Sequence, residues 1–150
     1  MKHSYSKLSF HLIWSTKNRE ALITDDIKNR LYGYIKTVIN DKKQHVYVIN
    51  GMPDHIHLLI GLSPTICVSD FIKDVKTSAT KWMHSSPINL KTFSWQEGFS
   101  AYTVGYSTIQ SVIQYIKNQE NHHQTVTFEE EYTHFLKLQN INHDQRFVLG

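Results

Sequence analysis

Alternation of apolar and polar residues along the chain predicts four β-strands. Over 7–15 every second residue is large and apolar and the residues between are mostly polar, which is the period of a strand. Two β-rich runs cover 45–50 and 55–62, and a Gly-Met-Pro-Asp turn over 51–54 separates them. We therefore expect these two runs to form a hairpin. A weaker alternation over 99–105 predicts the fourth strand.

Apolar residues recur at helical spacing between and after these strands. Thr24, followed by two aspartates, starts a helix that runs to about Lys42. A second helix starts near Ser69, a third is capped by Ser107, and a capping box at Thr127 starts the last. The order β-α-β-β-α-β followed by two helices predicts an α+β, ferredoxin-like split βαβ fold with a mainly antiparallel sheet and C-terminal helices.

Length and composition favour a single domain over 1–150. A chain of 150 residues with 40% hydrophobic residues fits one compact unit. We divide it into a ferredoxin-like core (1–105), a helix (106–124) and a C-terminal helical tail (125–150). No apolar run approaches the roughly 20 residues of a membrane span, and the first ten residues contain no secretory apolar region. We expect a cytoplasmic protein without a membrane partner.

Histidine content is more informative than charge. The net charge of +3 permits nucleic-acid binding without demanding it. The single cysteine, Cys67, excludes an internal disulfide and a cysteine-based zinc cluster. Ten histidines are present, and histidine ligates metals and moves protons.

Two of these histidines, His55 and His57, occupy positions i and i+2 of a predicted strand. Their side chains should project side by side from one face, with Ile56 on the other. Two adjacent imidazoles on a rigid strand form half of a site for a divalent metal. Taken alone, such a pair is more often two ordinary histidines.

A second pair, Tyr115 and Gln119, is spaced i, i+4 on the predicted helix 106–124. The apolar stripe of this helix places both residues on its flank, with His122 beside them. Tyr115 is therefore expected at the boundary of the core, where a phenol can reach a substrate. Either residue alone is explained more simply as an ordinary helix-edge side chain.

Taken together, these motifs resemble those of the single-tyrosine transposases of the HUH class, named for a His-hydrophobic-His motif. Here that motif is His55-Ile56-His57, preceded by the turn 50–54. The segment Trp95–Tyr102 and the segment Tyr115–His123 resemble two further family motifs, and the resemblance covers nearly the whole chain in order. It implies a nucleophilic Tyr115 that cleaves DNA, leaving a 5′-phosphotyrosine and a free 3′-hydroxyl. It also implies Mg²⁺ or Mn²⁺ held by His55, His57 and Gln119.

The chemistry agrees with the roles that the resemblance implies. A free phenol has a pKa near 10 and is a weak nucleophile at neutral pH. A cation beside the phosphate oxygens would help the attack, because it would offset the negative charge that develops there. Three neutral ligands leave the full charge on the metal and coordination sites open for phosphate. No residue identifies itself as the general base, and His122 is a candidate for proton transfer.

Basic residues suggest where DNA would bind. Lys73, Lys76 and Lys81 lie on one predicted helix, and Lys17 and Arg19 form a second small patch. Such side chains suit phosphate contacts, although a solvated helix face explains them equally well. Among nearby aromatic residues, Trp95, Phe99 and Tyr102 are candidates for stacking on unpaired bases or for packing.

The resemblance further implies single-stranded DNA with hairpin ends as substrate and a homodimer as the working form. Three other functions stay open. The chain could be a domesticated relative that acts on dispersed palindromic repeats. It could be a hairpin-binding module without the reaction, or a metal phosphodiesterase that uses water.

Overall fold

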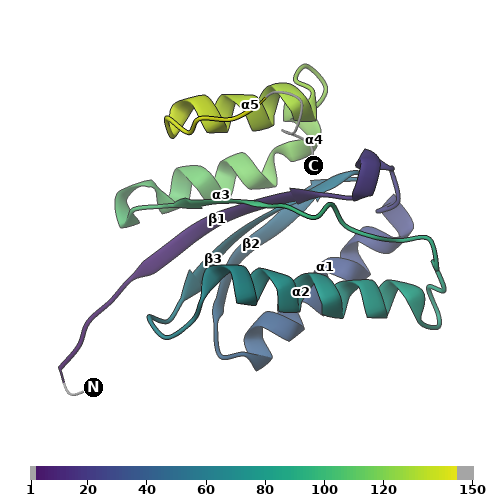
Figure 1. Ribbon diagram of the computed structural model, residues 1–150, viewed down its shortest axis with the longest axis horizontal. Helices are drawn as coiled ribbons and strands as arrows, with labels where there is room; N and C mark the ends of the chain where they lie inside the picture. The colour runs from purple at the N-terminus through teal and green to yellow at the C-terminus, as the bar shows by residue number, and fades with distance from the viewer. Residues whose placement is uncertain (1–2, 145–150) are drawn as a thin grey trace.

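A computed structural model describes residues 3–144 of the chain. The elements confirm the expected α+β order, and Figure 1 labels them. They are β1 (Leu8–Ser15), α1 (Asp25–Asp41), β2 (His45–Met52), β3 (His55–Leu62), α2 (Val68–His84), β4 (Ser100–Thr103), α3 (Ile109–Lys117), α4 (Gln119–His122) and α5 (Phe128–Leu138), with two 3-10 helices, η1 (Lys17–Arg19) and η2 (Tyr106–Thr108).

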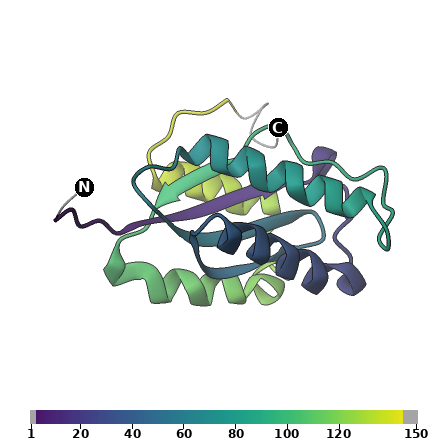
Figure 2. The same ribbon diagram turned by 90° about the horizontal axis from the view of Figure 1, so that it is seen from below.

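The four strands form one sheet in the order β2-β3-β1-β4. Each neighbouring pair is antiparallel, and β1 and β2 lie on either side of β3, as the split βαβ arrangement requires. Helices α1 and α2 cover one face of the sheet, while α3, α4 and α5 cover the other (Figures 1 and 2). The sheet is therefore buried on both sides.

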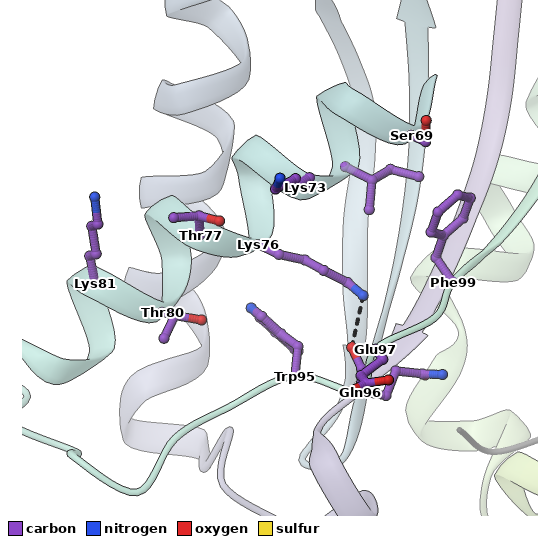
Figure 3. Close-up of a pocket in the computed structure, with 11 residues that line it drawn as sticks. Ser69, Lys73, Lys76, Thr77, Thr80, Lys81, Trp95, Gln96, Glu97 and Phe99 are labelled. Carbon is purple, nitrogen blue, oxygen red and sulfur yellow. Dashed lines mark hydrogen bonds between the residues drawn. The ribbon is translucent and has the colours of Figure 1, made fainter. Parts of the chain in front are cut away.

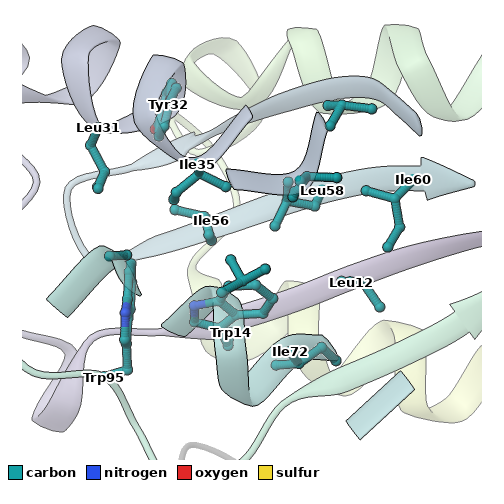
Figure 4. Close-up of a cluster of buried hydrophobic side chains, with 14 of the residues drawn as sticks. Leu12, Trp14, Leu31, Tyr32, Ile35, Ile56, Leu58, Ile60, Ile72 and Trp95 are labelled. Carbon is teal, nitrogen blue, oxygen red and sulfur yellow. The ribbon is translucent and has the colours of Figure 1, made fainter. Parts of the chain in front are cut away.

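The larger core lies between the sheet and helices α1 and α2 (Figure 4). Alternate residues of β3, Ile56, Leu58 and Ile60, are fully buried there together with Leu12 and Trp14 of β1. Full burial of a large aliphatic side chain contributes about 1.5–3 kcal/mol. This face of the sheet therefore anchors the central strands, and it confirms the predicted inward side of 55–62.

The opposite face has two small apolar clusters with a polar region between the strands and helices. In one cluster Ile13 packs with Phe128 and Tyr132 of α5. In the other, Leu59 packs with Ile109 and Ile116 of α3. Five other residues on this face of β1 and β3 are polar yet buried: Ser9, His11, Ser15, His55 and His57. Burying polar groups favours hydrogen bonding among them, so this region is where side-chain chemistry concentrates.

The prediction of one helix over 106–124, capped by Ser107, is wrong in two places. Ser107 lies inside η2, and α3 begins only at Ile109. The helix then breaks at Asn118, where the backbone leaves helical geometry. The side chain of Asn50 donates to the carbonyls of Ile116 (3.0 Å) and Lys117 (3.2 Å). It thereby satisfies carbonyl groups that the end of a helix leaves without partners.

The C-terminal part agrees with the predicted last helix. Thr127 and Glu130 form the capping box, and α5 follows it. The predicted tail reaches residue 150, but its last part, 145–150, lies outside the described residues. Within residues 3–144 no helix is both long and apolar enough to cross a membrane.

Gly51 makes the turn into β3 possible, and its replacement should disrupt that turn. A Cβ atom there would lie 2.2 Å from the backbone oxygen of His55 and 2.8 Å from Cα of Ile56. We expect Gly51→Ala to lower the free energy of unfolding by about 1–3 kcal/mol or more, measured by urea denaturation. Gly33→Ala in α1 is the matched control, because its Cβ would meet nothing within 4 Å. A Gly51→Ala variant as stable as the wild type would contradict this.

Candidate active site

Strand β3 carries the predicted histidine pair to the buried polar region. His55 and His57 both have no exposed surface. His55 Nδ1 lies 2.8 Å from an oxygen of Asp54, and His57 Nδ1 lies 2.8 Å from Nε2 of His11. Each imidazole is thus fixed by its Nδ1 partner, as metal-binding histidines usually are. Their Nε2 atoms face the C-terminal helices.

Tyr115 and Gln119 meet these histidines from α3 and α4. Gln119 is fully buried, and its Oε1 lies 3.1 Å from His55 Nε2. Tyr115 is half-buried, and its hydroxyl lies 3.1 Å from Nε2 of His122. The break at Asn118 leaves both side chains in the cluster. A single chain therefore brings together the four residues singled out in the sequence.

A fifth group, the carboxylate of Glu131 from α5, lies at the centre of the cluster. Its Oε1 is 3.0 Å from His57 Nε2. Its Oε2 accepts hydrogen bonds from the Tyr115 hydroxyl and from Gln119 Nε2, and it lies 3.1 Å from His122 Nε2. Sequence reasoning missed this residue. The available signal was a carboxylate on the same helical face as Phe128 and Phe135.

His123 also belongs to the cluster and was not singled out as a candidate site residue. Its Nε2 lies 3.1 Å from Oε1 of Glu131, and its Nδ1 lies 2.7 Å from the carbonyl oxygen of Val126. It is therefore fixed in the same way as the two histidines of β3. A pair of adjacent histidines at the end of the helix was the visible signal.

The electrostatics of the cluster follow from burial and mutual contacts. Burial lowers the pKa of His57 to about 4. Burial alone would raise the pKa of Glu131, but hydrogen bonds from His123 and His57 hold that pKa well below its usual range. Burial, reinforced by the nearby Glu131 carboxylate, raises the pKa of Tyr115. The ground state therefore pairs an ionised carboxylate with a neutral phenol.

These side chains fit a divalent metal ion. One ligand atom from each of His55, His57, His123 and Glu131 lies within 4.8 Å of the others, and Gln119 Oε1 adjoins them. Imidazole nitrogen and carboxylate oxygen are common ligands of divalent ions. The buried cluster could therefore hold one such ion.

A comparison with protein families gives the context of this cluster. The model of the family described as "Transposase IS200 like" matches residues 4–119, which is more than half of the chain. The chain belongs to this family. The transposase is 26% identical to the ISDra2 transposase TnpA of Deinococcus radiodurans over 120 residues, which cover 77% of this chain and 86% of the relative. It is 22% identical to the IS200 transposase of Salmonella typhimurium over 124 residues, or 79% and 81% of the two chains.

Solved structures support the same fold for this transposase. A crystal structure of a Deinococcus radiodurans protein assigned as a transposase has a TM-score of 0.66 and 29% identity, covering 79% of this chain and 95% of that one. A REP-associated tyrosine transposase bound to a REP hairpin has a TM-score of 0.63, covering 84% and 74% of the two chains. Its identity of 19% shows a shared fold.

A separate groove of about 570 Å³ lies on the α2 side of the transposase (Figure 3). Helix α2 lines it with two threonines and with the exposed Lys73 and Lys81. Phe99 lies across from α2 and is 37% exposed. The groove and the histidine cluster thus occupy opposite sides of the sheet, since α2 and α5 cover opposite faces.

The other candidates for DNA contact have different surroundings. Lys76 donates to the carbonyls of Gln96 (3.0 Å) and Gly98 (2.7 Å) and so ties that segment to α2. Two of the three aromatic candidates, Trp95 and Tyr102, are buried packing residues. In the second basic patch Lys17 is exposed, while Arg19 pairs with Asp54 at 3.8 Å, beside His55.

The half-buried position of Lys76 predicts a pH-dependent stability. Burial lowers its pKa to about 8 in the folded chain, whereas an unfolded lysine has a pKa near 10.4. Between about pH 8 and pH 10.4 the unfolded chain binds more protons, so the free energy of unfolding rises with pH in that window. We expect the stability of the wild type relative to Lys76→Gln to increase from about pH 8 to pH 10.4 in urea titrations. A constant difference would contradict the assignment.

Proposed function

We propose that this IS200-family transposase cleaves and rejoins single-stranded DNA at element ends, with Tyr115 as the nucleophile. The observation that carries the proposal is the contact of the Tyr115 hydroxyl with the cluster that holds His55, His57 and Gln119. The Tyr115 hydroxyl thus lies among the side chains proposed to bind the metal, where an attacking oxygen would be needed. Family membership supports DNA cleavage and joining.

The proposed step is a transesterification at phosphorus. The Tyr115 oxygen forms a bond to the phosphorus of a phosphodiester, and the bond from phosphorus to the 3′-oxygen breaks. Tyr115 loses a proton and the departing 3′-oxygen gains one, so the products are a 5′-phosphotyrosine and a 3′-hydroxyl. The number of phosphate ester bonds is unchanged. Rejoining by the reverse step therefore needs no ATP.

The chain's own residues would position and deprotonate the phenol. The Tyr115 hydroxyl donates its hydrogen bond to Glu131 Oε2, and His122 Nε2, which lies 3.1 Å from the same hydroxyl, is proposed to take the proton when the phenol ionises for attack. His55, His57 and Gln119 would hold Mg²⁺ or Mn²⁺, which when bound supplies positive charge beside the phosphate oxygens. The fixed Nδ1 partners of the two histidines keep their ligand atoms aimed at one place.

We propose that DNA with hairpin ends binds across the groove lined by Lys73 and Lys81, with Lys17 and Arg19 contributing beside the cluster. Lysines that line an open groove suit phosphate contacts, and Phe99 offers an exposed ring for an unpaired base. The related REP-associated transposase is bound to a hairpin. The working form is proposed to be a homodimer.

Covalent trapping tests the nucleophile. Labelled single-stranded DNA with candidate hairpin ends, including palindromic repeats, is mixed with the protein and Mg²⁺ or Mn²⁺ and separated on a denaturing gel. We expect a metal-dependent shifted band that is absent in Tyr115→Phe, because the attacking oxygen is gone. Tyr106→Phe is the matched control, since this tyrosine is 78% exposed on the preceding segment, and it should keep the band.

The other outcomes of trapping identify the alternatives. Cleavage without an adduct, unchanged in Tyr115→Phe, would indicate a metal phosphodiesterase that uses water. A hairpin-dependent shift on a native gel, with no cleavage of any end sequence, would indicate a binding module. An adduct on palindromic repeats alone would indicate the domesticated relative.

Salt dependence tests the DNA groove. The double variant Lys73→Gln, Lys81→Gln should bind DNA more weakly, and the negative slope of log K against log salt should become shallower by about 1 for each phosphate group that the variant no longer neutralises. The matched control is Lys137→Gln, an exposed lysine on α5. Fluorescence anisotropy at several salt concentrations gives both slopes. Equal slopes for the double variant and the wild type would place the DNA elsewhere.

A further inference from the structure

The two oxygens of Glu131 face different halves of the active site. Oε1 lies 3.0 Å from His57 Nε2, 3.1 Å from His123 Nε2 and 3.5 Å from His55 Nε2. Oε2 accepts the hydrogen bond of the Tyr115 hydroxyl. One carboxylate therefore connects three imidazole nitrogens with the proposed nucleophile.

The separations around Oε1 match those between ligands of one metal ion. Metal–nitrogen and metal–oxygen bonds of about 2.0–2.2 Å place adjacent ligand atoms about 3–3.5 Å apart and opposite ones about 4.2 Å apart. The four ligand atoms of His55, His57, His123 and Glu131 all lie within 4.8 Å of one another. They therefore span roughly one coordination sphere.

Charge provides a second, independent argument. The Glu131 side chain is 1% exposed, and in the described part of the chain its ion-pair partners are histidines, without a lysine or arginine among them. A buried carboxylate is costly unless hydrogen bonds and positive charge compensate it. A divalent ion among the imidazoles would supply that charge, and the carboxylate would in turn stabilise the buried ion.

From this geometry we infer that Glu131 and His123 are further metal ligands, and that Glu131 also positions the Tyr115 hydroxyl beside the metal. The inference rests on the proposed function and extends its ligand set beyond His55, His57 and Gln119. Three imidazoles and a carboxylate favour a transition-metal ion over Mg²⁺. Mn²⁺ should therefore bind more tightly than Mg²⁺.

Metal titration without DNA tests the inference. Free Mn²⁺ is measured by electron paramagnetic resonance for the wild type, Glu131→Gln and His123→Ala, with folding checked by circular dichroism. We expect the dissociation constant to rise at least about tenfold in both variants. Glu129→Gln and His134→Ala are the matched controls, because both side chains are exposed on α5, and they should bind as the wild type does. Tyr115→Phe should also keep its affinity.

An unchanged affinity in Glu131→Gln would overturn the inference, because the carboxylate would then not be a metal ligand. A higher affinity would also overturn it, because the carboxylate would then hold the histidine nitrogens away from the metal. If Glu131→Gln does not fold, the affinity of His123→Ala and X-ray absorption of the Zn²⁺-loaded wild type test the inference instead. We expect the absorption spectrum to show three imidazole ligands on the metal. Two imidazole ligands would overturn the inference. Tighter binding of Mg²⁺ than Mn²⁺ would also overturn it. If the covalent adduct depends on Tyr115 but Mn²⁺ affinity is unchanged in both Glu131→Gln and His123→Ala, the inference about these two ligands fails and the proposed function still holds.

Discussion

Strand β3 faces two layers at once, and the rest of the structure depends on this constraint. Side chains alternate along a strand, so fixing Ile56, Leu58 and Ile60 in the large core fixes His55 and His57 on the opposite face. A register slip of one residue would exchange the two sets. The energy that packs the core thus also orients the histidines, and the site needs little stabilisation of its own to keep its geometry.

The hairpin that delivers β3 shares in this constraint. Gly51 pairs with Ile56 across the hairpin at a distance that admits no side chain. The next residue pair, Met52 with His55, closes the ladder just before the turn. Asp54 in the turn then contacts His55 through one oxygen and Arg19 through the other. Backbone register and the hydrogen bonding of the first histidine are therefore set within one short segment.

Local patterns in the sequence predicted what local physics decides. The strand alternation, the capping box at Thr127 and the side of β3 that carries the histidines needed only neighbouring residues. At the break beside Asn118 the partner of the free carbonyls is Asn50, which lies far away in sequence, so helical periodicity could not reveal this contact. Glu131 was missed for a related reason. The structure buries it against residues from three other elements, which lie far from it in sequence.

Glu131 is a carboxylate on the otherwise apolar face of α5, and the side chains around it explain how it can be buried there. Helix α5 packs on the sheet through Phe128, Tyr132 and Leu136, and these contacts force Glu131 into the polar region above β3. Ionising a buried carboxyl there is unfavourable unless the histidines, Gln119 and the phenol all donate to it, as the observed contacts show. The same contacts draw α3, α4 and α5 onto one point. The carboxylate therefore organises the helical layer around the site, as the core organises β3 beneath it.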